Sequence, residues 1–60
     1  MTIFVTEYRF KGNTEWLPRR DGKRIDAHAD ESDAEKVVAR ESSLFGDNTD
    51  YRVANYERVP

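Results

Sequence analysis

The 60-residue chain carries ten Lys or Arg and twelve Asp or Glu, a formal net charge of −2. With no Cys and one His, the composition excludes disulfides and cysteine-based metal sites, and we expect no metal and no cofactor. A chain this short forms one domain, residues 1–60, and buries only about 60% of the surface that its unfolded form exposes. No apolar run approaches the roughly 18 residues of a membrane span, so we expect a cytoplasmic protein without membrane contact.

The first predicted element is a strand at residues 2–11, TIFVTEYRFK, which is rich in β-branched and aromatic types. Alternation places the even-numbered residues from Phe4 to Phe10 on one face and the odd-numbered residues from Ile3 to Arg9 on the other. The first half is apolar on both faces. This pattern indicates a central strand, or a strand whose second face meets another protein.

A short extended piece and a hairpin follow. The piece at residues 14–17 contains Trp16 and stops at Pro18, which belongs at a sheet edge because it cannot donate to a ladder. Asp21-Gly22 between extended segments is a two-residue hairpin signal, since both residues tolerate positive φ. The hairpin carries four cations, Arg19, Arg20, Lys23 and Arg24. As exposed charges these contribute little to stability, so we expect Arg19→Ala combined with Arg20→Ala to leave the melting curve nearly unchanged.

Residues 25–29 have a period of two, which is typical of a half-buried strand. The apolar side comprises Ile25, Ala27 and Ala29, and the polar side comprises Arg24, Asp26 and His28. A His flanked by carboxylates can act as a general base or a metal ligand. We favour a solvent-facing His28 instead, because no second His, Cys or nucleophile motif accompanies it.

A helix is predicted from Ser32 to Phe45. Ser32 and Glu35 fit the capping box, in which the Ser hydroxyl accepts from a backbone N–H and the Glu carboxylate reaches back. Gly46 is expected to end the helix in the left-handed conformation. The apolar stripe, interrupted by Glu41, comprises Ala34, Val37, Val38, Leu44 and Phe45.

The last predicted strand spans residues 51–59. Tyr51 and Val53 share one face while Ala54 and Tyr56 share the other, so we expect a bulge near Ala54 or Asn55 that brings both pairs to the core. The elements together predict an α+β fold: an antiparallel sheet of three to four strands with one helix packed on one face, in the order β-(β)-β-α-β.

Charge is distributed unevenly along the chain. Residues 1–25 carry six basic and three acidic groups, and residues 26–60 carry four basic and nine acidic groups. Local potentials of this kind guide association, so each side is a candidate partner-binding surface. The basic candidates are Arg19, Arg20, Lys23 and Arg24 with Trp16. The acidic candidates are Asp26, Asp30, Glu31, Asp33 and Glu35, of which the last three also complement the helix dipole.

The absence of a nucleophile motif and of a Gly-rich phosphate loop favours a binding protein over an enzyme. The favoured hypothesis is a non-catalytic protein-binding module that inhibits or modulates a larger protein. One alternative is a nucleic-acid-binding accessory protein whose hairpin contacts phosphates while Trp16 stacks a base. Another is a homodimer in which residues 3–10 pair across a two-fold axis.

The order of features over residues 23–60, with IDAHADESDAEKVVARE before the helix end and YERVP at the close, resembles a family of phage proteins. These are the small early proteins of T7-like phages that inhibit the host RNA polymerase, which have a short antiparallel sheet and a single helix. The resemblance implies a small non-enzymatic protein that binds a much larger host protein, such as RNA polymerase, and blocks it. The basic hairpin has no matched counterpart, and no individual site residue is carried over.

Overall fold

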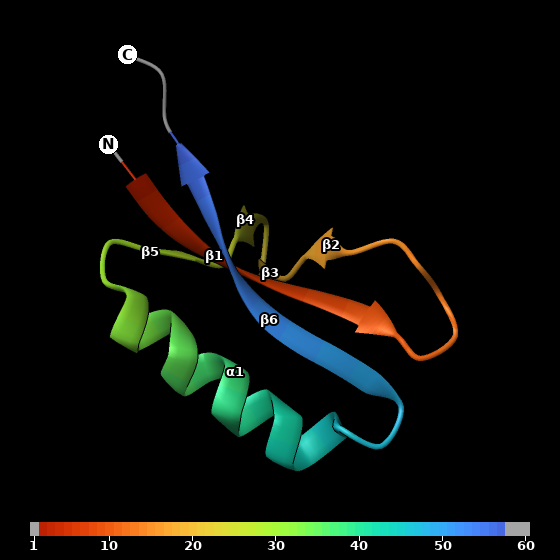
Figure 1. The fold of residues 1–60 in the computed structure, drawn as a ribbon. Coiled ribbons are helices and arrows are strands. Elements are labelled where there is room, and N and C mark those ends of the chain that lie inside the picture. Colours follow the sequence, from red (N-terminus) through yellow and green to blue (C-terminus); the bar gives the residue numbers. More distant parts are fainter. Residues whose placement is uncertain (1, 58–60) are drawn as a thin grey trace.

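The computed structural model describes residues 2–57, which form a four-stranded sheet, a two-stranded hairpin and one helix (Figure 1). The elements are β1 (Thr2–Phe10), β2 (Leu17–Pro18), β3 (Arg20–Asp21), β4 (Arg24–Ile25), β5 (Ala27–His28), α1 (Glu31–Phe45) and β6 (Thr49–Glu57). All strand pairs are antiparallel, and α1 packs against the sheet. The predicted α+β class is confirmed.

β1 is the central strand, as its apolar residues on both faces indicated. One edge pairs with β6 along its whole length, from Thr2 opposite Glu57 to Phe10 opposite Thr49. The other edge pairs with β5 near the start of β1 and with β2 near its end. Over residues 4–8 both edges of β1 are therefore paired within the chain, which leaves no open edge there for strand pairing with a second copy.

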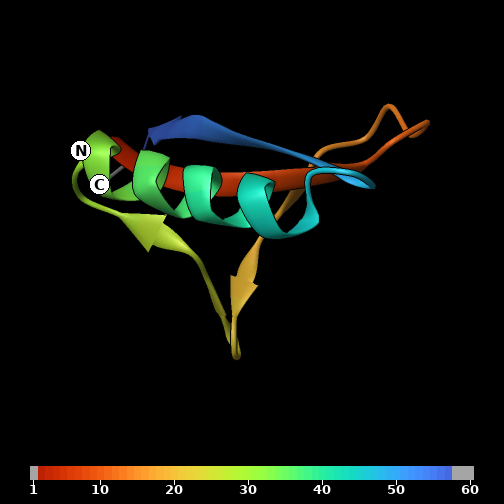
Figure 2. The same ribbon diagram turned by 90° about the horizontal axis from the view of Figure 1, so that it is seen from below.

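Opposite Thr6 of β1, the chain leaves the edge of the sheet after β2 and forms the hairpin before it returns as β5. The Arg19 N–H donates to the Thr6 carbonyl at 2.8 Å, and the Thr6 N–H donates to the Asp26 carbonyl at 3.1 Å. The Asp26 N–H closes the base of the hairpin by donating to the Arg19 carbonyl at 2.8 Å. Residues 20–25 consequently project away from the sheet between β2 and β5 (Figure 2).

The hairpin is confirmed, but its turn lies one residue later than predicted. Asp21 pairs with Arg24, so the two turn residues are Gly22 and Lys23. Gly22 has φ +67°, and no non-glycine residue among those described has positive φ. Glycine at the first central position is the mark of a type II′ turn, which spares Asp21 the left-handed conformation that the Asp-Gly reading required.

α1 begins at Glu31, with Asp30 as the N-cap residue, and the Asp30 side chain makes no capping hydrogen bond. The predicted capping box of Ser32 and Glu35 is wrong, because Ser32 already lies in the first helical turn. Glu31 and Asp33 in that turn place negative charge at the N-terminal end of the helix dipole, which is favourable without a side-chain cap.

We expect Ser32→Ala to change the free energy of unfolding by no more than about 0.5 kcal/mol, because the hydroxyl caps nothing. A true N-cap serine would cost ~1 kcal/mol when truncated, which lowers the melting temperature of so small a domain by roughly 4–8 °C. Melting curves recorded by circular dichroism distinguish the two cases, and a drop of that size would contradict the helix start at Glu31.

The predicted left-handed end of the helix is also wrong. Gly46 has φ −64° and ψ −15°, and its N–H donates to the Ser42 carbonyl at 2.9 Å. An ideal Cβ at this position would collide with the Ser42 carbonyl oxygen. Gly46 is therefore suited to this position by the lack of a side chain rather than by access to positive φ.

The apolar stripe of α1 is buried only along part of its length. Ala34 is fully buried and Val38 is half-buried, whereas Leu44 and Phe45 are exposed. The last turn of α1 lies beside the end of the sheet, where β1 has finished and β6 has just begun (Figure 1). The last turn of the predicted apolar stripe therefore lies outside the core.

The faces of the strand after the hairpin are the reverse of those predicted. Asp26 is 9% exposed and His28 is half-buried, while Ile25 is 43% exposed and Ala27 is exposed. His28 stands opposite Phe4 in the register, which turns it to the side of the sheet covered by α1. A carboxylate is buried at low cost only when it is paired and hydrogen-bonded, and Asp26 meets both conditions here.

β6 pairs with β1 in one register without interruption, so the predicted bulge near Ala54 is wrong. Tyr51 lies with Tyr8 on the side of the sheet that carries α1, which we call the helix face. Ala54 lies with Val5 on the opposite side, which we call the open face. Tyr51 and Val53 thus pack on the helix face of β1, and Ala54 and Tyr56 pack on its open face. The predicted strand end at Val59 lies outside the described residues.

Candidate functional site

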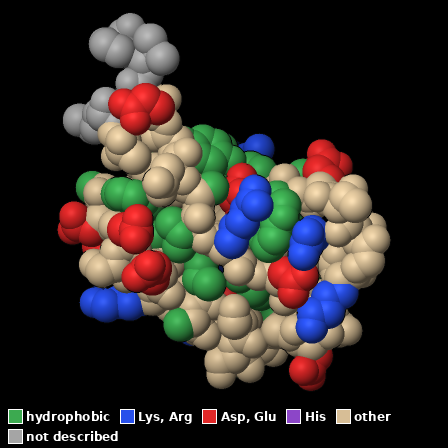
Figure 3. Space-filling model, viewed as in Figure 1, with side chains coloured by type: hydrophobic (Ala, Val, Ile, Leu, Met, Phe, Trp, Pro, Cys, Tyr) green, Lys and Arg blue, Asp and Glu red, His purple; other side chains and the backbone are tan. Residues whose placement is uncertain are grey.

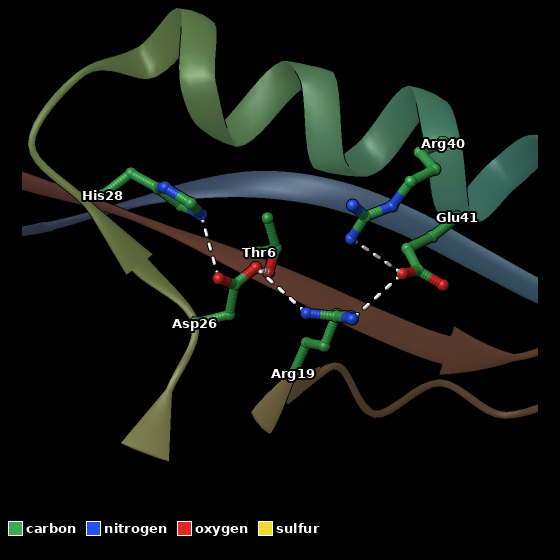
Figure 4. A network of polar contacts seen from close by, with 6 residues as sticks. All are labelled: Thr6, Arg19, Asp26, His28, Arg40 and Glu41. Atoms are coloured by element: carbon green, nitrogen blue, oxygen red, sulfur yellow. Dashed lines mark hydrogen bonds and ion pairs between the residues drawn. The ribbon is translucent and has the colours of Figure 1, made fainter. Parts of the chain in front are cut away.

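A polar network on the helix face ties the base of the hairpin to β1 and α1 (Figure 4). It comprises Thr6, Arg19, Asp26, His28, Arg40 and Glu41. The Arg19 guanidinium bridges two carboxylates, at 3.3 Å from Asp26 Oδ2 and 2.9 Å from Glu41 Oε1. The Thr6 hydroxyl donates to Asp26 Oδ2 at 2.5 Å. Both carboxylate side chains are 10% exposed and that of Arg19 is 24% exposed, so this network is structural.

His28 lies against the same carboxylate. Its Nε2 is 2.9 Å from Asp26 Oδ1, close enough for an ion pair when the ring is protonated, although the ring N–H is not aimed at the oxygen as a hydrogen bond requires. The predicted solvent-facing position of His28 is wrong, because its strand turns this face toward α1.

The network removes Arg19 and Asp26 from the predicted partner-binding surfaces. Arg19 and Asp26 are committed to each other and to Glu41, so neither belongs to a freely exposed charged surface. The sequence signal for this pairing is Glu41 itself. An acid on the sheet-facing stripe of a helix needs a cation from elsewhere in the fold, and Arg19 supplies it.

A groove of about 570 Å³ opens beside the network, between β2, the end of β1 and the start of β6. Its apolar lining comprises Tyr8, Phe10, Leu17, Pro18 and Tyr51, and its polar lining comprises Arg19, Arg20 and Thr49. The Tyr8 and Phe10 rings pack edge to face with centroids 5.6 Å apart. Phe10 is 54% exposed and Leu17 is 40% exposed, so the groove offers bulky apolar surface to solvent.

Two further exposed apolar side chains, Leu44 and Phe45, lie at the same end of the molecule. The short connection from α1 to β6 is held there by two backbone hydrogen bonds: Asn48 N–H donates to the Phe45 carbonyl at 3.3 Å, and Lys11 N–H donates to the Asn48 carbonyl at 3.0 Å. Exposed apolar side chains gathered in one region mark interaction surfaces more often than scattered ones do.

The basic hairpin stands at one wall of this groove. Arg20 lines the groove, and Lys23 and Arg24 follow on the exposed β3–β4 hairpin. None of these three side chains forms an ion pair or a side-chain hydrogen bond within residues 2–57. The structure therefore separates the two neighbouring arginines: Arg19 is held in the network, and Arg20 is free beside the groove.

Tyr51 forms part of the groove next to Glu41. Burial, reinforced by the nearby Glu41 carboxylate, raises the pKa of Tyr51 above its ordinary value. The phenol, which is neutral at physiological pH as in an ordinary tyrosine, presents an apolar ring with a hydroxyl donor to the groove.

Trp16 lies on the open face, away from this groove. The guanidinium groups of Arg9 and Arg52 lie 4.5 and 4.2 Å from the centroid of its ring, and the side chain is half-buried. Cation–π contacts of this kind already engage the ring, which leaves little of it free to stack a nucleic-acid base.

In Figure 3, small hydrophobic patches are separated by basic and acidic side chains on the side of the molecule shown.

Glu7 is buried on the open face and accepts two hydrogen bonds. Arg52 Nε donates to it at 2.7 Å and the Tyr56 hydroxyl donates at 2.6 Å. Burial alone raises the pKa of Glu7, but the hydrogen bonds from Tyr56 and Arg52 together outweigh it and hold this pKa below the ordinary 4.5. The hydrogen bond to Glu7, followed by burial, raises the pKa of Tyr56.

Tyr56→Phe is expected to raise the pKa of Glu7 and to reduce the stability that the ionised Glu7 carboxylate contributes above pH 4.5. A group whose pKa is lowered by folding contributes stability above its unfolded pKa, near 4.5, and loses it as the pH falls through the folded-state pKa. Without the phenol donor the folded-state pKa lies closer to 4.5, so this contribution is smaller and its loss is complete at a higher pH. Titration of the Glu7 carboxyl carbon by NMR measures the change, and an unaltered titration curve would contradict the assigned hydrogen bond.

The remaining acidic candidates form a separate cluster. Asp30, Glu31, Asp33 and Glu35 are exposed around the N-terminal turn of α1. The groove lies toward the other end of this helix, so the fold keeps the acidic cluster apart from Arg20.

Fold and surface together define a small α+β protein with a helix on one face of its sheet and a free basic hairpin beside an exposed aromatic groove. Among residues 2–57, no cluster of three or more His, Asp or Glu side chains is arranged to hold a metal ion. α1 is too short and too polar to cross a membrane. Comparison with protein-family models, with curated protein sequences and with solved structures finds no match.

Proposed function

We propose that this protein is a non-catalytic protein-binding module that inhibits or modulates a larger protein in the cytoplasm of a bacterial host, as small early phage proteins do. The observation that carries the proposal is the exposed apolar groove with Arg20 at its wall. Protein interfaces commonly combine apolar and aromatic anchors at the centre with charges at the rim. The resemblance over residues 23–60 makes RNA polymerase the first partner to test.

A protein partner fits the surface better than nucleic acid does. Trp16, the proposed stacking platform, is engaged by Arg9 and Arg52, and Arg19 is neutralised by two carboxylates. Nucleic-acid binding draws mainly on cations that are free to neutralise phosphates. Beside the hairpin, the exposed surface is an apolar groove rather than a continuous stripe of free cations.

Affinity capture from bacterial lysate tests the proposal. We compare the parent with Leu17→Ser, which removes an exposed apolar anchor, and with Lys36→Gln, which removes an exposed cation on α1 far from the groove. The parent and Lys36→Gln are expected to retain one stoichiometric protein partner, while Leu17→Ser binds about 30-fold more weakly, as truncated interface anchors do. Circular dichroism checks that each variant is folded.

Two results would overturn the proposal. One is recovery of no stoichiometric protein from lysate at either ~50 mM or ~500 mM salt, since surface charges are strongly screened only at the higher value. The other is capture of nucleic acid alone, with an affinity that falls steeply with salt.

A further inference from the structure

We infer that the groove receives an extended acidic segment of the partner, with one bulky apolar side chain seated against Tyr8 and Leu17 and neighbouring carboxylates facing Arg20. The inference rests on the proposed function and specifies the chemistry of the partner. It makes the two linings of the groove, apolar and cationic, parts of one recognition site.

The charge of the groove selects an acidic ligand. Arg19 lines the groove but its charge is balanced by Asp26 and Glu41, at 3.3 and 2.9 Å. Arg20 is the one lining cation left without a carboxylate partner among the described residues, and no Asp or Glu is part of the lining. Lys23 and Arg24 extend the positive potential along the same hairpin. A carboxylate next to Arg20 therefore gains a charge-assisted hydrogen bond without displacing an internal one.

The size and floor of the groove select a bulky apolar side chain. Its volume, about 570 Å³, falls within the roughly 300–1,000 Å³ of clefts that take ligands. The edge-to-face pair of Tyr8 and Phe10 gives it a rigid aromatic floor. A Phe or Leu side chain flanked by backbone fills such a space, whereas a purely charged peptide leaves the apolar lining in water.

The chain's own acidic cluster does not have this chemistry. Its acids, Asp30, Glu31, Asp33 and Glu35, lie around the N-terminal turn of a helix rather than on an extended segment. The apolar residue among them, Ala34, is small and fully buried. Presented by a second copy of the chain, this cluster therefore offers no bulky apolar side chain beside its carboxylates to enter the groove.

Three synthetic nine-residue peptides test the inference by NMR titration of the labelled protein. One carries a central Phe flanked by Asp and Glu, the second replaces these acids with Asn and Gln, and the third replaces the Phe with Ala. The first is expected to bind about tenfold more tightly than either control. Its amide shifts are expected at Leu17, Arg20 and Tyr51 and not at Arg52 on the open face.

Arg20→Gln is expected to remove the preference for the acidic peptide over its amide analogue, while Lys36→Gln keeps it. Equal binding of the acidic and amide peptides to the parent, or shifts confined to the open face, would overturn the inference. If lysate capture succeeds and this discrimination fails, the proposed function stands without it. If capture fails, the proposed function itself is overturned.

Discussion

Arg19→Ala is expected to lower the free energy of unfolding by about 2–4 kcal/mol, because it strands two buried carboxylates without their shared cation. The Asp26 and Glu41 side chains are each 10% exposed, so water does not replace the lost partner fully. The lower part of the range allows for Arg19 itself, which is 24% exposed. Thermal melts and urea titrations followed by circular dichroism measure the loss.

Arg20→Ala is the matched control, since it removes the same side chain from the next position. It is expected to change the free energy of unfolding by no more than about 0.5 kcal/mol, because Arg20 is exposed and has no partner within the described residues. The sequence alone predicts that neither arginine contributes to stability. The structure predicts instead that Arg19 contributes and Arg20 does not. Equal melting temperatures for the two variants would show that the network contributes nothing.

Val5→Ala is expected to cost about 2 kcal/mol, through lost apolar burial and the cavity left behind. Val5 is 1% exposed and, with Ala34, is one of two buried hydrophobic residues among those described. In a core this small, no other buried side chain within residues 2–57 is available to fill the cavity. The melting temperature is expected to fall by roughly 8–16 °C, at 4–8 °C per kcal/mol.

Ile25→Ala removes more side chain than Val5→Ala but from a position that is 43% exposed. Its expected cost is no more than about 1 kcal/mol, because most of the side chain is already in water. A larger loss for Ile25→Ala than for Val5→Ala would restore the sequence-based assignment of faces, with Ile25 inside and Asp26 outside.

The elements of the fold follow from local sequence. β1 is visible in its run of β-branched and aromatic residues, the hairpin in Gly22, and α1 in the spacing of Ala34 and Val38. These signals depend on backbone preferences and periodicity, which act over a few residues. The predicted cap at Ser32 differs from the observed N-cap Asp30 because a Ser-x-x-Glu pattern fits equally well within the first turn of a helix that begins with acidic residues.

The site depends on contacts that local patterns do not encode. Asp26 is turned inward because it meets Arg19 across the base of the hairpin and Thr6, which is remote in the chain, on β1. A period of two fixes which residues share a face but not which face is buried. The groove likewise joins residues from β1, β2 and β6, so its aromatic lining becomes visible only once the strand register is known.

Amide hydrogen exchange of the protein alone and in its captured complex tests most directly where the partner binds. Exchange protection gained at Leu17, Arg20 and Tyr51, with no change at Asp33 and Arg52, is the result that a partner seated in the groove predicts. Protection gained instead around Asp33 at the N-terminal turn of α1, or around Arg52 on the open face, with the groove amides unchanged, would contradict it.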